Sequence, residues 1–232
     1  QNAIFALVGS LDPEAVIAQF EATLGSWRPD STPPPSERPA VELPGARIVR
    51  TIDIPARPQL DLIFGVLAMR RHSEDYYAAV VANVILGELG MMGRLGASIR
   101  DELGLVYDIG SDLYANRAQR PWIVSAGVAP EHLDETIAGI EGEIDRMREQ
   151  LVSQEEMDDA RTLLIGSLPL HLETNEGIAG YLLNVASYDL GLDYVKRYPD
   201  IVSTVTAQDV REVMRRYWPR GRAVITAAGT FS

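Results

Sequence analysis

The chain has 232 residues, of which 46% are hydrophobic and 23% are charged, and its formal net charge is −12. This composition is typical of a globular protein that can bury a substantial core, and the negative charge argues against a nucleic-acid partner. The sequence contains no cysteine, which excludes disulfides, thiolate metal ligands and a cysteine nucleophile. No continuous run of apolar residues is long enough to cross a membrane.

The first 45 residues predict a small unit followed by a linker. Asn2–Val8 has the apolar character of a buried strand, and Asp12-Pro13-Glu14 is typical of a helix start. Gly25 is placed to end that helix. Six prolines between residues 29 and 44 indicate an extended linker. We therefore expect a strand–helix unit over 1–29, a proline-rich linker over 30–45 and a main domain over 46–232.

The start of the sequence also bears on localisation. It lies inside a strand-like run, without an initiator methionine or the pattern of a signal peptide. We expect a fragment of a longer protein, whose first strand and helix pack on something outside this chain. The compartment, cytoplasm or periplasm, stays open.

The main domain combines paired strands with a run of helices. Alternating and apolar segments predict strands over 48–54, 59–69, 105–114, 122–128 and 223–228. The segment over 59–69 is the most continuously apolar, so we expect it to be more fully buried than the segment over 48–54. Helical periodicity and capping residues predict helices over 73–86, 133–151, 153–169, 174–190 and 206–217. The fold class is therefore α+β, an antiparallel-dominated sheet with helices packed on one face.

One stretch, residues 87–107, carries the strongest candidate for function. Four glycines recur at three-residue intervals, which suits a loop approached closely by another chain rather than a helix interior: Gly87, Gly90, Gly93 and Gly96. A short helix carrying Arg100 follows, and Gly104 is placed to end it. Tyr107 then falls at the start of a strand.

Other chemistries are poorly supported by the sequence. The three histidines, His72, His132 and His171, have no partners at zinc-ligand spacing. His132-Leu-Asp-Glu-Thr136 has threonine where a His-x-x-Glu-His motif needs its second histidine. We expect no metal site in this chain, and no nucleotide-binding loop is present. The acidic pairs Glu155-Glu156 and Asp158-Asp159 are interpreted as exposed helix residues.

Arg100 and Tyr107 together suit recognition of a carbonyl or carboxylate. A guanidinium can hold an oxygen, and a phenol can donate to charge that develops in a transition state. Two structural alternatives stay open. Tyr107 shares strand parity with Leu105 and Ile109 and could be a core residue, and Arg100 could pair with Asp101 or Asp108.

The stretch from Gly90 to Tyr107, with its Gly-Arg-Leu and Arg-Asp-Glu-Leu-Gly-Leu-Val-Tyr segments, resembles the second half of the M16 (pitrilysin/insulinase-like) metallopeptidases. The opening strand and helix with Val8-Gly9-Ser10-Leu11-Asp12, and Pro58-Gln59 before a strand, are similar too. The resemblance covers nearly the whole chain. It implies the LuxS/MPP-like metallohydrolase type of α+β fold.

The resemblance implies that zinc lies in a partner half and that this half, inactive alone, supplies Arg100 and Tyr107 near it. Tyr107 is expected to hydrogen-bond an oxyanion, Arg100 to hold a substrate carbonyl or C-terminal group, and the peptide to bind extended along a sheet edge. Gly87, Gly90, Gly93 and Gly96 correspond to a glycine-rich substrate loop. The alternative function is a non-catalytic assembly protein of the same fold, similar to core subunits of respiratory complexes.

Overall fold

A computed structural model of the chain describes residues 3–27, 41–42, 44–88 and 93–231. The predicted linker over 30–45 therefore lies mostly outside the described residues, as does Gly90. The chain divides into two compact units. The smaller comprises Gln1–Pro39 with Gly166–Tyr198, and the larger comprises Ala40–Ile165 with Pro199–Ser232.

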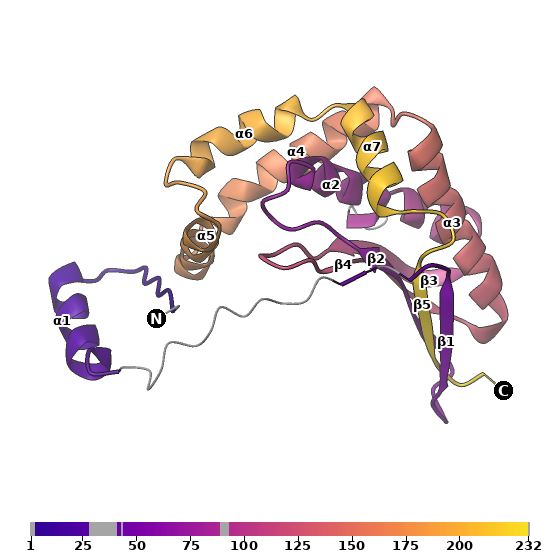
Figure 1. Cartoon of the computed structure of the whole chain (residues 1–232), viewed down its shortest axis with the longest axis horizontal. Helices are drawn as coiled ribbons and strands as arrows, with labels where there is room; N and C mark the ends of the chain where they lie inside the picture. The colour runs from indigo at the N-terminus through magenta and orange to yellow at the C-terminus, as the bar shows by residue number, and fades with distance from the viewer. Residues whose placement is uncertain (1–2, 28–40, 43, 89–92, 232) are drawn as a thin grey trace. The chain divides into compact units, whose positions relative to one another are not determined.

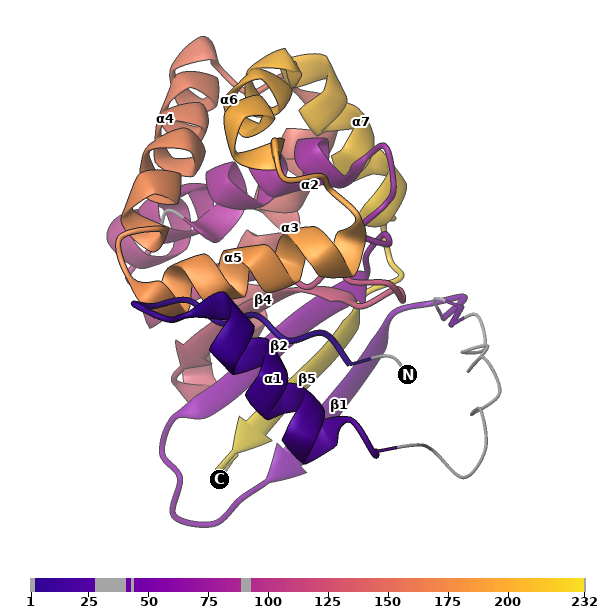
Figure 2. The same ribbon diagram turned by 90° about the vertical axis from the view of Figure 1, so that its left-hand side faces the viewer.

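The larger unit is built on one five-stranded sheet with the order β1-β5-β2-β4-β3. Its strands lie side by side in Figure 2 and are β1 (Ile48–Asp53), β2 (Leu60–Leu67), β3 (Val106–Leu113), β4 (Pro121–Val128) and β5 (Val224–Gly229). Only β1 and β5 pair in parallel, and the other three ladders are antiparallel. The predicted antiparallel-dominated sheet is confirmed.

Helices cover one face of this sheet, as the sequence predicted (Figure 1). They include α2 (Tyr76–Asn83), α3 (Leu133–Glu149) and α7 (Ala207–Tyr217), with a 3-10 turn, η4 (Pro130–His132), before α3. Two π-helical segments, η1 (Val84–Glu88) and η3 (Gly96–Glu102), flank the glycine-rich stretch. Strand β2 is more fully buried than β1, as the sequence predicted, but it alternates at first: Leu60 and Leu62 are buried, whereas Ile63 is 39% exposed. The second face of the sheet explains this alternation, because exposed side chains project from it.

Aromatic packing joins the helices to the sheet. Trp122 of β4 and Trp218, which follows α7, are both almost completely buried, with ring centroids 5.5 Å apart. Phe64 of β2 stacks on Trp218 at 6.0 Å. Large rings of this kind bury more apolar area per residue than any aliphatic side chain, so this cluster forms the centre of the core.

The smaller unit contains α1 (Pro13–Leu24) and α5 (Asn175–Tyr188), while α4 (Gln154–His171) and α6 (Tyr194–Thr204) contribute to both units. The predicted helix starts at Asp12, Thr174 and Thr206 are confirmed by their hydrogen bonds, whereas the helix predicted from residue 73 begins at Tyr76 and lacks a side-chain cap. Asp12 accepts from the N–H groups of Glu14 and Ala15, and Thr174 accepts from Gly177. Thr206 forms a capping box with Asp209. Capping depends on local chemistry, which is why the sequence located these ends well.

Two predictions about elements were wrong. Residues 3–8 form no strand, since a strand needs a neighbour for its hydrogen bonds and no described strand pairs with this segment. Helix α6 was not predicted, because Pro199 lies inside it and proline is a poor residue for a helix interior. Among the described residues, no helix combines the length and apolar character needed to cross a membrane.

A buried asparagine fixes the end of α2 against the sheet. The Asn83 side chain is 2% exposed and donates from Nδ2 to Glu88 Oε2 at 2.9 Å and to the Ser111 carbonyl at 3.2 Å. Its Oδ1 accepts from Trp122 Nε1 at 2.7 Å, and Ser111 Oγ donates to the Asn83 carbonyl at 3.1 Å. One amide therefore connects α2 and η1 to β3 and β4.

Replacing Asn83 by alanine is expected to lower the free energy of unfolding by about 2–4 kcal/mol. The substitution leaves the Trp122 indole N–H without its acceptor inside the core, and unpaired buried polar groups cost about 1–3 kcal/mol each. Urea denaturation measures the change. Asn184→Ala, an exposed asparagine on α5, is the matched control and should change stability by less than about 0.5 kcal/mol. Equal effects of the two substitutions would contradict this role.

Candidate functional site

The helix that carries Arg100 is anchored by its apolar side. Leu95 and Ile99 are completely buried. Ile99 packs against Gly139 of α3, where an added β-carbon would lie 3.2 Å from Ile99 Cγ1. Arg100 follows directly, with 29% of its side chain exposed. Arg100 therefore lies on the flank of a helix whose apolar side is buried.

Gly104 ends this helix, which confirms the prediction. Its φ is +65°, in the left-handed region that favours glycine, and its N–H donates to the Arg100 carbonyl at 3.1 Å. The N–H of Leu105 donates to the Ile99 carbonyl at 3.1 Å. The chain thus reverses within two residues and enters β3 beside the helix it has left.

A β-bulge exposes Tyr107. Val106 pairs with Val128 and Asp108 pairs with Gly127, so Tyr107 is an extra residue in β3 without a partner in β4. The bulge breaks the alternation of the strand, and the Tyr107 side chain is 82% exposed. The alternative that Tyr107 is a core residue is therefore wrong, because strand parity does not hold across a bulge.

Arg100 and Tyr107 lie side by side at this point. The Arg100 Cζ is 5.9 Å from the centroid of the Tyr107 ring, and the nearest acid to Arg100 is Asp101, at 3.8 Å from Nη1 to Oδ1. The distance to Asp101 is long for a charge-assisted hydrogen bond. A guanidinium and a phenol of different elements are thus presented together on one surface, where an oxygen of a ligand can contact both.

The described glycines of the 87–96 stretch are buried. At Gly87 an added β-carbon would lie 2.8 Å from the backbone nitrogen of Ser111, so only glycine lets η1 approach β3 this closely. Gly93 approaches Gly87 in turn, at 3.0 Å from its would-be β-carbon to the Gly87 Cα, and Gly96 is buried at the start of η3. Close backbone packing explains these small residues, and their part in substrate binding stays a prediction.

An ion pair that the sequence did not reveal lies beside this helix. Arg94 contacts both carboxylate oxygens of Glu156, at 2.6 Å from Nε and 3.0 Å from Nη2. The Glu156 side chain is 29% exposed, so its interpretation as an exposed helix residue was wrong, whereas Glu155 and Asp158 are exposed. Burial alone would raise the pKa of Glu156, but hydrogen bonds from Arg94 and Ser153 outweigh it and hold the pKa below its ordinary value.

The histidines do not gather with other potential zinc ligands. His132 ends η4, with its Nδ1 3.9 Å from Glu135 Oε2, and Thr136 is completely buried in α3. Across the described ranges, no three side chains of His, Asp or Glu come together in a way that could hold a metal ion. The described residues of this chain therefore do not fit a zinc site.

The sequence and the fold are both similar to those of known proteins. The family described as peptidase M16 inactive domain matches residues 1–164. An uncharacterized zinc protease of Streptomyces coelicolor is 27% identical over 221 residues, which make up 91% of this chain and 47% of that protein.

Solved protein structures are also similar to this chain. A peptidase M16 inactive domain from Pseudomonas fluorescens superposes with a TM-score of 0.80 and 26% identity, over 94% of this chain and 51% of its own. A chain of complex III2 from Candida albicans has a TM-score of 0.76 at 18% identity, over 95% and 53% of the two chains. The second likeness shows the fold alone. This chain spans about half the length of these relatives.

Replacing Gly104 by alanine is expected to lower the free energy of unfolding by about 1–2 kcal/mol, because a β-carbon is unfavourable at a left-handed φ. Gly142 of α3 is exposed and has open space around it, so Gly142→Ala should instead stabilise the protein by about 0.5–1 kcal/mol. Thermal or urea unfolding of the two variants measures both changes in the free energy of unfolding. A stabilising Gly104→Ala would contradict the helix end described above.

The lowered pKa of Glu156 makes its contribution to stability depend on pH. Because the folded pKa lies below the ordinary value of 4.5, the contribution is present above that value and is lost as the pH falls through the folded pKa. The stability difference between wild type and Glu156→Gln should therefore shrink as the pH falls from about 6 to about 3. Urea titrations at each pH measure it. Exposed Glu155→Gln is the control, and a difference independent of pH would rule out the linkage.

Proposed function

Because the chain belongs to the peptidase M16 inactive domain family, we propose that it is the half of a zinc-dependent peptidase that holds no metal itself. Its task is to bind peptide opposite a zinc-bearing half through Arg100 and Tyr107. The relationship to a zinc protease and the absence of a ligand cluster among the described residues support placing zinc in that other half. Zinc supplies Lewis-acid chemistry at the scissile carbonyl.

The juxtaposition of Arg100 and Tyr107 is the observation that carries this proposal. The bulge exposes the Tyr107 hydroxyl, which can donate a hydrogen bond to an oxygen that gains negative charge. Arg100, whose Cζ lies 5.9 Å from the centroid of the Tyr107 ring and which is itself partly buried, holds a neighbouring carbonyl or a C-terminal carboxylate of the peptide. The two groups bind and orient the substrate from this side.

The peptide binds in an extended conformation. Strand β3, which carries Tyr107, is one of the two edge strands of the sheet, so the part of its outer edge near Tyr107 can take an extended segment by β-augmentation. We assign Gly87, Gly93 and Gly96, together with Gly90 outside the described residues, to the loop that shapes the approach of the peptide, because glycine allows close backbone approach. The buried glycines serve this role in addition to the close backbone packing described above.

We further propose that the zinc-bearing half packs on residues 3–27, the segment that contains α1. No described residue of α1 is buried, and apolar side chains before and within it are strongly exposed: Ile4, Phe5, Leu7, Leu11 and Ile17. So many exposed apolar residues on one short segment mark an interaction surface. The relatives are about twice as long as this chain, which leaves room for such a half.

The test is peptide hydrolysis by this chain together with its zinc-bearing half. Tyr107→Phe is expected to lower kcat by about tenfold to a hundredfold, because it removes one hydrogen bond to the developing oxyanion, and Arg100→Ala should raise KM as well. Neither substitution should greatly change the stability of the fold, which the midpoint of urea denaturation measures. Tyr114→Phe, just after the end of β3, and Arg50→Ala, on β1, change exposed residues away from the site and are the matched controls.

The alternative is a non-catalytic assembly protein, for which the likeness to a chain of complex III2 gives the fold but no residue. An assembly role does not need an exposed tyrosine beside an arginine. Full turnover by both Tyr107→Phe and Arg100→Ala would remove the catalytic assignment. Failure of the complete protein to cleave any unstructured peptide would favour the assembly role.

A further inference from the structure

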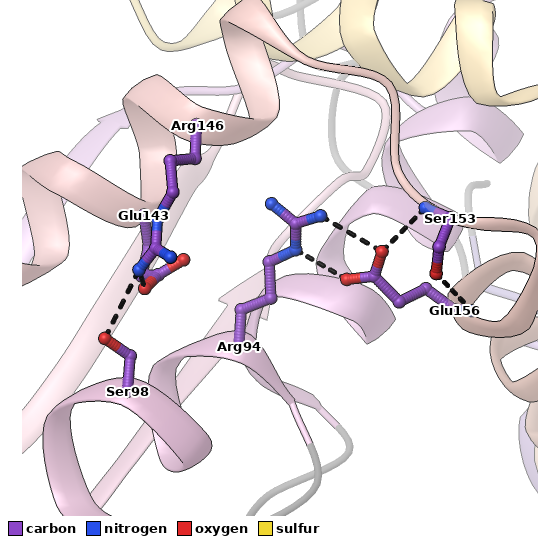
Figure 3. Close-up of polar contacts among 6 residues, drawn as sticks. All are labelled: Arg94, Ser98, Glu143, Arg146, Ser153 and Glu156. Carbon is purple, nitrogen blue, oxygen red and sulfur yellow. Dashed lines mark hydrogen bonds and ion pairs between the residues drawn. The ribbon is translucent and has the colours of Figure 1, made fainter. Parts of the chain in front are cut away.

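Arg94 lies at the start of the helical segment that carries Arg100. Its guanidinium forms two parallel hydrogen bonds with Glu156, at 2.6 and 3.0 Å, and both side chains are less than a third exposed (Figure 3). Glu156 also caps α4, since it accepts from the Ser153 N–H at 2.7 Å while its own N–H donates to Ser153 Oγ at 3.1 Å. The start of α4 is thereby tied to the start of η3.

A second pair reaches the same helix from α3. Glu143 is 2% exposed, and its carboxylate contacts the guanidinium of Arg146, one turn further along α3. Arg146 Nη2 also donates to Ser98 Oγ at 3.4 Å, and Ser98 lies on η3 two residues before Arg100 (Figure 3). A carboxylate this deeply buried requires a partner, and Arg146, whose side chain is 55% exposed, supplies it from the solvent side.

These pairs hold a helix of unusual geometry. Segment η3 is π-helical over seven residues, whereas π-helices are rare and mostly single turns. Such backbone persists where its surroundings over-determine it. Ile99 anchors the buried side of η3, Arg94–Glu156 holds its start, and Glu143–Arg146 contacts its middle through Ser98. We call the two ion pairs and Ser98 the η3 clamp.

We propose that Arg94, Glu143, Arg146 and Glu156 are positioning residues whose η3 clamp keeps Arg100 beside Tyr107. None of the four forms a hydrogen bond or an ion pair with Arg100 or Tyr107. A bidentate arginine–carboxylate pair fixes orientation as well as distance, which a lysine at the same place cannot do. The effect on turnover rests on the proposed function, whereas the effect on the position of Arg100 does not.

The position of Arg100 relative to Tyr107 can be measured without an activity assay. Tyr107 is replaced by 3-fluorotyrosine in the chain paired with its zinc-bearing half, and the ¹⁹F resonance is compared between variants. Arg100→Ala defines the shift when the guanidinium is gone. Arg94→Met and Glu143→Gln should move the resonance more than halfway to that value, and Arg94→Lys, which keeps the charge, should move it less.

Two controls separate positioning from general destabilisation. Ser153→Ala removes one hydrogen bond of the α4 cap but keeps the Arg94–Glu156 contacts. Arg161→Gln breaks an ion pair with Asp158 on the same helix, away from η3. Both should lower the unfolding midpoint while leaving the Tyr107 resonance in place. If Arg94→Met does not fold, Arg94→Lys and Glu143→Gln decide the result.

Turnover supplies the second measurement. Arg94→Met is expected to lower kcat at least about tenfold, since a misplacement near 1 Å is enough for such a loss. It should also raise KM in the same direction as Arg100→Ala, and Arg94→Lys should recover part of both changes. A Tyr107 resonance that stays in place in both Arg94→Met and Glu143→Gln overturns the inference. So does a loss of kcat no larger than that of Ser153→Ala. Full turnover by Arg100→Ala and Tyr107→Phe overturns the proposed function instead, and the ¹⁹F result still decides the positioning.

Discussion

Asn83 lies buried where α2 gives way to η1, and its single amide joins that helix to two strands of the sheet. A buried amide costs free energy unless its partners are all in place, so it permits one register of helix on sheet and penalises the others. Gly87 lets the backbone approach β3 at the distance this register demands. The glycine-rich stretch, η3 and the entry into β3 all follow from that junction.

The site depends on a second constraint, the extra residue in β3. Without the bulge at Tyr107, strand alternation would turn the ring toward the covered face of the sheet, where Ile109 lies. With it, the ring lies in solvent beside Arg100. Helix end and bulge therefore act together, because Gly104 returns the chain beside η3 and the bulge selects which side chain points outward.

Much of the fold could be predicted because its signals are local. The caps at Asp12, Thr174 and Thr206 and the apolar stripe of α3 depend on neighbours within a few residues. The pairing of Arg100 with Tyr107 could be anticipated from their spacing around Gly104. The exposure of Tyr107 could not, because a bulge is a property of two paired strands and β4 gives no sign of it.

The remaining errors also trace to partners that are distant in sequence. Glu156 has the pattern of an exposed cap residue, and only Arg94, which lies 62 residues earlier, makes it a partly buried one. Residues 3–8 have the composition of a strand without a strand to pair with among the described residues. Asn83 gave one usable signal, a polar residue inside an apolar helix, which predicts a buried hydrogen-bond network when it cannot face water.

Stability does not account for the arrangement of Arg100 and Tyr107. A cation–π contact at an exposed site contributes about 0.5–1 kcal/mol, and at 5.9 Å this one lies near the outer limit of such contacts. A buried tyrosine would contribute more through the apolar area it removes from water. A guanidinium donates hydrogen bonds but accepts none, whereas a phenol both donates and accepts. Two neighbouring donors that face solvent are suited to an oxygen supplied by another molecule, which is why we propose that this oxygen belongs to a bound peptide.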